Sequence, residues 1–132
     1  MVIRTYDSNY RGECRSEMCE QMDCASWLEF NHPDRWPLIF HVPNEIRANP
    51  QYMQRRKKEG VKPGVSDLID FCAVRGAFEL KRRDKSKCKV SKEQREFLEA
   101  TAASGGFAAI CYGFEQFRVA YADYLIFVAQ NS

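Results

Sequence analysis

The sequence predicts an α/β fold in which helices flank a central mixed sheet. Apolar stretches of strand length alternate with longer segments of helical periodicity along the 132 residues. Two of the strand-like stretches, residues 67–74 and 77–81, are separated only by Arg75-Gly76, which is typical of an antiparallel hairpin. A helical segment then separates this hairpin from a continuous apolar run at 107–112, and that crossover makes the sheet mixed.

Local signals at the ends of the segments predict where each element begins and ends. Ser16 and Ser91 are good N-cap residues, and acidic or amide side chains follow each of them in the first turn. Pro50 suits the first turn of a short helix. We expect residues 1–15 to be a poorly ordered or extended lead-in and residues 16–132 to form a single domain. Within that domain the expected elements are a helix from 16 to before 31, a strand at 38–42, a basic helix at 49–59, the two hairpin strands, a helix from 92 to about 104, a strand at 107–112 and a helix from 114 to about 129.

Length and composition restrict the class of protein. With 45% hydrophobic and 29% charged residues, the chain has the balance of one ordinary globular domain. It has neither an apolar run of 18 residues nor an apolar stretch near the N-terminus, so we expect no membrane association and a cytoplasmic protein. The six cysteines form no CxxC pair, and we interpret them as reduced packing residues. An iron–sulfur cluster or a redox-sensitive dimer bond is the less favoured alternative.

Two segments concentrate the positive charge. Residues 45–62 carry six Lys or Arg against two Glu, and residues 81–92 carry seven against one Asp, although the formal net charge of the chain is only +2. Such runs are often simply solvated surface. Because these two flank the hairpin in sequence, we interpret them as a surface for a polyanion such as nucleic acid.

The hairpin brings acidic and basic side chains together. Asp67 begins its first strand, and strand alternation places Glu79 and Lys81 on one face of the second. Carboxylate and carbonyl oxygens are the ligands that Mg²⁺ and Mn²⁺ prefer, and the backbone carbonyl of Leu80 lies between the two side chains. A lysine at this place would orient a water or stabilise charge on a phosphate. Taken alone, the trio is more often an ordinary salt bridge on a sheet surface.

The trio does not stand alone, because several blocks along the chain resemble the virus-type replication-repair nuclease (VRR-NUC) family of the PD-(D/E)xK nuclease superfamily. The resemblance covers roughly residues 16–125, and the length is similar to the stand-alone phage and bacterial members. It implies a restriction-endonuclease-like αβββαβ core and a phage-encoded protein that acts in a host cell. The blocks are residues 40–45, 60–68, 79–82, 91–94 and 106–113.

The resemblance also assigns roles to single residues. It implies that Asp67 and Glu79 bind Mg²⁺ or Mn²⁺, with the Leu80 carbonyl as a further ligand, and that Lys81 is the catalytic lysine. Gln94 matches a glutamine that points into the site. The first helix of such enzymes supplies another acidic residue, for which Glu20 is our match, with Glu17 as the runner-up and Glu45 as a weaker candidate. His41 is more often a packed or solvent-facing histidine than a general base. Iron–sulfur and organic cofactors are not expected.

The function expected from these residues is metal-dependent endonucleolytic hydrolysis of DNA. The resemblance implies branched substrates such as four-way (Holliday) junctions and a homodimer with two active sites. The alternatives are a catalytically silent nucleic-acid-binding module, a flap or non-specific nuclease, and a site-specific restriction-type nuclease, for which no segment large enough for a recognition domain is evident. Expected phosphate contacts are Arg55, Arg56, Lys62, Arg82, Arg83 and Lys85.

Overall fold

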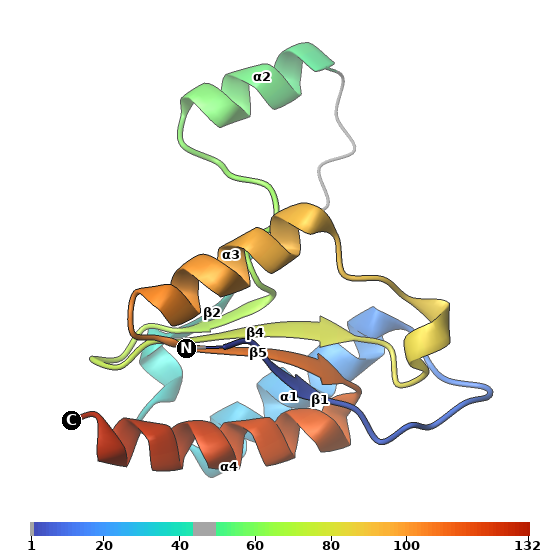
Figure 1. Cartoon of the computed structure of the whole chain (residues 1–132), viewed down its shortest axis with the longest axis vertical. Helices are drawn as coiled ribbons and strands as arrows, with labels where there is room; N and C mark the ends of the chain where they lie inside the picture. Colours follow the sequence, from blue (N-terminus) through green and yellow to red (C-terminus); the bar gives the residue numbers. More distant parts are fainter. Residues whose placement is uncertain (1, 44–49) are drawn as a thin grey trace.

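A five-stranded sheet lies between two layers of helices (Figure 1). The computed structural model describes residues 2–43 and 50–132. Within these residues, no helix is both long and apolar enough to cross a membrane. The elements are β1 (Arg4–Tyr6), α1 (Glu17–Asn31), β2 (Ile39–His41), α2 (Pro50–Lys58), β3 (Leu68–Asp70), β4 (Gly76–Lys81), α3 (Lys92–Ala103), β5 (Phe107–Tyr112) and α4 (Phe114–Gln130), with single 3₁₀ turns at Trp36–Leu38 and Lys85–Lys87.

The sheet is mixed, in the order β1-β5-β4-β3-β2. The pairs β2–β3 and β3–β4 are antiparallel, whereas β4–β5 and β1–β5 are parallel. Helix α3 makes the crossover from β4 to β5 and covers one face, while α1 and α4 cover the other (Figure 1). The predicted α/β class and its mixed sheet with flanking helices are therefore confirmed. The order α1-β2-β3-β4-α3-β5 is the αβββαβ core that the sequence led us to expect.

Aromatic side chains fill the layer between the sheet and helices α1 and α4. Phe78 of β4 is 1% exposed, and the centroids of four other rings lie 5.3–5.8 Å from its own. Two of those rings are Tyr121 and Tyr124 of α4, which the apolar final helix turns toward the sheet. On the other face, Leu98 of α3 packs on Ile110 and other small or branched side chains of β4 and β5. These two cores hold β4, the strand that carries Glu79 and Lys81, buried along its whole length.

The structure differs from the sequence prediction at two places. Residues 4–6, for which we expected a poorly ordered or extended lead-in, form β1, the edge strand beside β5. The first hairpin strand ends at Asp70 rather than at residue 74, because the backbone N–H of Cys72 donates to the Asp70 carboxylate (N···O 3.2 Å) and turns the chain there.

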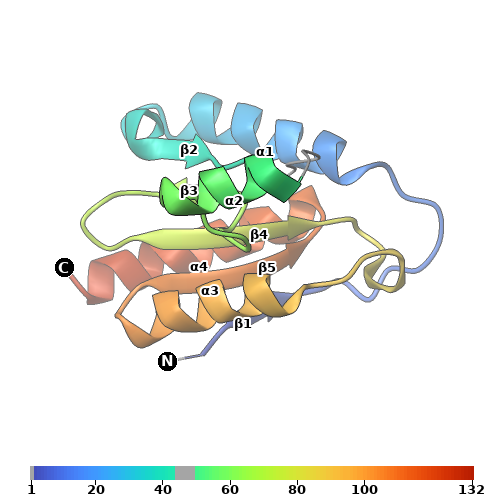
Figure 2. The same cartoon turned by 90° about the horizontal axis from the view of Figure 1, so that it is seen from above.

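Helix α2 stands away from the sheet and its covering helices (Figure 1). Seen from above, it lies over the region between α1 and α3 (Figure 2). The loop that returns from α2 passes close to α3 at Gly64. There φ is +83°, and a Cβ atom would lie 2.3 Å from the backbone of Glu93, so only glycine fits. This close approach delivers the chain to Asp67 beside the first turn of α3.

Candidate active site

Asp67 sits where β3 and β4 begin to separate. The antiparallel register pairs Leu68 with Phe78, and one further step places Asp67 opposite Glu79. At this position the side chain of Asp67, and not its backbone, bonds to β4. Its Oδ2 accepts a hydrogen bond from the Leu80 N–H (2.8 Å). Its backbone carbonyl accepts the Val42 N–H (3.0 Å) and lies 2.8 Å from Nδ1 of His41. Asp67 is thereby fixed against strands on both sides.

Three carboxylates converge at this point. Glu17, Asp67 and Glu79 each offer an oxygen, and these oxygens all lie within 4.8 Å of one another. Asp67 is 8% exposed and Glu79 is fully buried. Among the described residues, no group donates a hydrogen bond to Oε1 of Glu79. Hard divalent cations bind such groups of carboxylate oxygens, and a buried acceptor without a donor is a group that a cation would satisfy. The residues present therefore fit a Mg²⁺ or Mn²⁺ ion.

Lys81 and Gln94 form the opposite side of this group. The Lys81 ammonium lies 3.6 Å from Oε2 of Glu79 and donates to Oε1 of Gln94 at 3.1 Å. Gln94 belongs to the capping box of α3, in which its Oε1 accepts the Ser91 N–H (2.8 Å). The Nε2 of the same amide donates to Oε2 of Glu79 (3.1 Å). One side chain thus caps a helix and fixes both the carboxylate and the ammonium.

The pKa of Glu79 lies well above its ordinary value of 4.5. Burial is the largest cause, and the negative charge of Asp67 adds to it, whereas Lys81 acts in the opposite direction. Because the charged form of this carboxyl is disfavoured, a cation that binds among the three carboxylates stabilises it. The electrostatics of the site therefore favour binding of a divalent ion.

The structure places Glu17, and not Glu20, beside Asp67 and Glu79. Glu17 is the first residue of α1, where the positive end of the helix dipole favours a carboxylate. Glu20 lies one turn further on. Its Oε1 accepts hydrogen bonds from Arg15 (2.8 Å) and from the backbone N–H of Phe114 (2.8 Å), the first residue of α4. Glu20 therefore caps α4, which has no capping side chain of its own at Gly113. Glu17, which the sequence made only the second choice, occupies the acidic group.

The other predicted ligands and site residues are placed as follows. The N–H of Leu80 is fixed by Asp67, and ligation by its carbonyl stays a prediction. His41 lines the cleft beside Asp67. Glu45 lies outside the described residues.

An open cleft of about 570 Å³ leads to the acidic group. Glu17, Asp67 and Gln94 line it, and the exposed face of α1 forms a wall. The sequence does not reveal this wall, because methionines at helical spacing do not indicate whether they face the core or the solvent. Its place beside the site depends on how α1 packs on α4.

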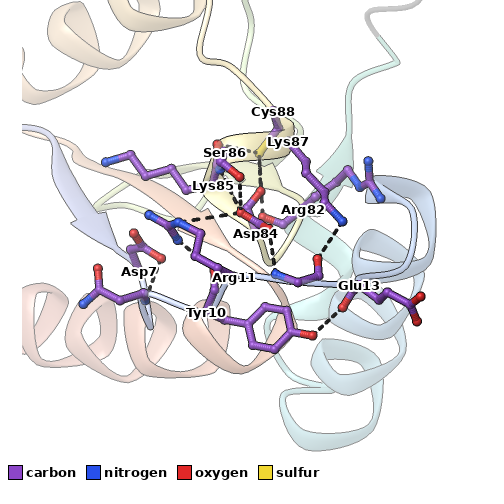
Figure 3. Close-up of polar contacts among 12 residues, drawn as sticks. Asp7, Tyr10, Arg11, Glu13, Arg82, Asp84, Lys85, Ser86, Lys87 and Cys88 are labelled. Atoms are coloured by element: carbon purple, nitrogen blue, oxygen red, sulfur yellow. Dashed lines mark hydrogen bonds and ion pairs between the residues drawn. The ribbon is translucent and has the colours of Figure 1, made fainter.

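The second basic segment is held to the N-terminal part of the chain through Asp84, as Figure 3 shows. The buried Asp84 carboxylate accepts the N–H groups of Gly12 (2.8 Å) and Ser86 (2.9 Å). Arg82 donates to the carbonyls of Cys14 (3.0 Å) and Arg15 (3.3 Å), and the Arg83 guanidinium lies 4.1 Å from the ring centroid of Tyr10. Two of the predicted phosphate contacts thus have structural partners within the chain.

The remaining predicted phosphate contacts lie in α2, in the loop after it and in the 3₁₀ turn at Lys85–Lys87. Arg55 and Arg56 belong to the last turn of α2, and Lys62 is exposed in the loop that follows it. Lys85 is exposed, and its Nζ lies 5.7 Å from the ring centroid of Tyr112. Phosphate binding by any of these residues stays a prediction.

The fold and the site together define an α/β protein with an acidic group and a lysine at the point where two central strands separate. No protein-family model matches the sequence, and no curated protein matches it significantly. Among solved structures, one described as a "VRR_NUC domain protein" superimposes with a TM-score of 0.71 over 87% of this chain and 92% of that chain, at 20% sequence identity. The chain therefore shares the fold of a VRR_NUC domain protein, in agreement with the resemblance found in the sequence.

Proposed function

We propose that the protein is a divalent-metal-dependent nuclease that hydrolyses phosphodiester bonds of DNA. The observation that carries the proposal is the convergence of Glu17, Asp67 and Glu79 beside Lys81, with Oε1 of Glu79 buried and without a donor. The shared fold with a VRR_NUC domain protein supports it. No comparable group of three His, Cys, Asp or Glu side chains is found elsewhere in the described residues, so this is where a catalytic ion would bind.

Each side chain has a role that follows from its contacts. Glu17, Asp67 and Glu79 would hold Mg²⁺ or Mn²⁺, which when bound polarises the phosphate and lowers the pKa of a water. Lys81 lies beside Glu79 and is positioned to hold the water or to stabilise the charge on the phosphate. Gln94 keeps the Lys81 ammonium and the Glu79 carboxylate in register through its two amide atoms. Asp67 additionally ties the site to β4 through the Leu80 N–H.

Endonucleolytic cleavage of branched DNA, with the four-way junction as its best-known form, is the finer part of the proposal. A two-fold substrate suits a homodimer with two sites. Helix α4 supports a dimer surface only in part, because Tyr121 and Tyr124 are buried in the core. Val119 and Ile126, which are 50% and 56% exposed, share its outer face and are the residues that would pair.

The decisive experiment is a cleavage panel of four-way junction, flap, single-stranded and duplex DNA with Mg²⁺ and with Mn²⁺. Asp67→Ala and Lys81→Ala are expected to abolish measurable cleavage, whereas Glu96→Ala, which removes a 59% exposed carboxylate on α3 outside both basic segments, is the matched control. If the unmutated protein binds these DNAs but cuts none, it is the catalytically silent binding module. Equal cutting of every substrate would leave a non-specific nuclease and remove the preference for branched DNA.

The dimer is tested separately by light scattering coupled to size-exclusion chromatography. Val119→Asp with Ile126→Asp is expected to give a monomer. Phe71→Asp, which places the same charge on a 65% exposed residue outside α4, is expected to leave the dimer intact. A monomeric unmutated protein would contradict the homodimer.

A further inference from the structure

The wall of the cleft beside the acidic group is apolar. Met18, Met22 and Ala25 lie at i, i+4 and i+7 along α1, so they form one stripe of the helix, and all three line the cleft. The opposite stripe of α1, which includes Cys24 and Leu28, is buried in the core. The two methionines are 68% and 62% exposed, so this second apolar stripe is left open to solvent.

The charges around the cleft determine which class of ligand it can bind. Glu17 and Asp67 are acidic, and no lysine or arginine is found among the described residues that line the cleft. Away from a bound cation, this surface would repel a phosphate, and among the described lining residues only His41 can become positively charged. An uncharged, flat and apolar group is the better occupant. The volume of about 570 Å³ lies in the range of about 300–1,000 Å³ that is usual for pockets that receive small organic groups.

In a DNA substrate, the uncharged and flat group nearest to a phosphate is a nucleobase. Glu17 and Met18 are adjacent, and Met22 follows one helical turn later, about 6 Å along the helix axis. A phosphate at the acidic group therefore brings its own base to the methionines. In a continuous duplex the faces of that base are covered by stacking, so contact requires a nucleotide that is unstacked.

We infer that the cleft receives the unstacked base of the nucleotide beside the scissile phosphate, with Met18 and Met22 against the face of the base. This inference rests on the proposed function and gives it a substrate class, which is DNA with an unpaired or splayed nucleotide at the cut. Methionine has a flexible, polarisable side chain that packs against aromatic rings of different shapes. The contact therefore selects the structure of the DNA and tolerates its sequence. Half-buried Gln21 lines the same cleft beside the two methionines.

The test compares a normal nucleotide with an abasic one at the cut site, in an oligonucleotide that passes from duplex to single strand. For the unmutated protein we expect kcat/KM to fall roughly 10- to 100-fold when the base is removed. Met18→Ala with Met22→Ala is expected to lose a similar factor on the normal substrate and little more on the abasic one. Met18→Leu with Met22→Leu is expected to retain the preference. Phe30→Ala, which removes an 85% exposed aromatic ring from the far end of α1, is the matched control.

A binding measurement separates this inference from the proposed function. The unpaired position carries 2-aminopurine, whose fluorescence reports the environment of the base, and Ca²⁺ is present as the cation. Base-dependent binding that the alanine pair removes would support the base site even if no DNA is cleaved, and the hydrolytic function alone would then be wrong. If cleavage and binding are equal for the normal and abasic DNAs, or if the alanine pair weakens both DNAs equally, the base site is overturned and the nuclease remains.

Discussion

Two buried carboxylates on the same hairpin, Asp70 and Glu79, have opposite surroundings. Asp70 is 1% exposed and accepts hydrogen bonds from Arg35 (3.2 and 3.3 Å), from the hydroxyl of Tyr121 (2.7 Å) and from the N–H of Cys72. Glu79 is equally buried, but it faces Asp67 and Glu17, and one of its oxygens has no donor among the described residues. The surroundings of Asp70 stabilise the fold. The surroundings of Glu79 disfavour its charged form until a cation binds, and this distinguishes a binding site from a structural ion pair.

The largest expected difference between Asp70 and Glu79 is in their effect on activity. Glu79→Gln keeps the shape of the side chain and removes its charge, so we expect kcat/KM for DNA to fall on the order of 10²- to 10⁴-fold. In EDTA at pH 8 the same variant should be more stable than the unmutated protein, by roughly 1–3 kcal/mol, because folding no longer has to protonate the Glu79 carboxyl or bury its charge. Glu96→Gln, at an exposed position on α3, serves as the control for both measurements. A variant that is inactive but less stable would mean that Glu79 is held by structural partners after all.

The opposite result is expected for Asp70. Asp70→Ala leaves the Arg35 guanidinium and the Tyr121 hydroxyl without their partner, and the free energy of unfolding should fall by about 3–5 kcal/mol. Denaturant titration measures this loss. Cleavage per folded molecule should change little, because Asp70 belongs to the Arg35 network and not to the acidic group. A loss below 1 kcal/mol would remove the distinction between the two carboxylates.

Stability should depend on pH in a way that cation binding reverses. The pKa of Glu79 is raised in the folded state, so the folded protein binds more protons than the unfolded chain above pH 4.5. Metal-free stability should therefore fall as pH rises from 4.5 toward the folded pKa, by at most about 1.4 kcal/mol per pH unit from this group. Saturating Mn²⁺ should oppose that fall, adding about 2.7 kcal/mol at one hundred times its dissociation constant. Thermal melting at several pH values, with Mn²⁺ or EDTA, measures both effects, and Glu79→Gln should show neither.

The smallest effect is expected at Asp84, a third buried carboxylate. Hydrogen bonds from the Ser86 side chain and the Gly12 N–H lower its pKa from 3.8 to about 2. The stability that it contributes is present above pH 3.8 and is lost as pH falls toward 2. Asp84→Asn should therefore be less stable than the unmutated protein at neutral pH, with a difference that shrinks in this acidic window. A difference that is the same at pH 2 and pH 7 would contradict a charged Asp84 as the anchor.

The sequence predicted those parts of the fold that depend on local signals. Ser16 caps α1 and Ser91 caps α3 as expected, because a cap requires only neighbouring residues. The apolar run at residues 107–112 became β5, since a strand buried on both faces is apolar throughout. Strand β1 was missed because Arg4–Tyr6 is short and partly exposed, and its pairing depends on β5, which is distant in sequence.

The site was predictable where the hairpin alone determines it. Register places Asp67 opposite Glu79, and alternation places Lys81 beside it. The choice between Glu17 and Glu20 was not predictable, because the two are one turn apart on α1 and differ only in what α4 offers them. Likewise, charge alone did not distinguish Arg82, which is bonded to backbone carbonyls, from the basic residues of α2.

The pairing of β1 with β5 also orders the events of folding. Tyr6 donates to Asp123 across 117 residues of sequence, and Arg4–Tyr6 can join the sheet only after residues 109–111 have been synthesised. Until β1 pairs with it, the outer edge of β5 presents unpaired backbone groups with which a strand of another chain can pair. A short peptide with the sequence of residues 2–7 would compete for that edge during refolding. Residues 4–6 are therefore made before the strand with which they pair, and they join the sheet late.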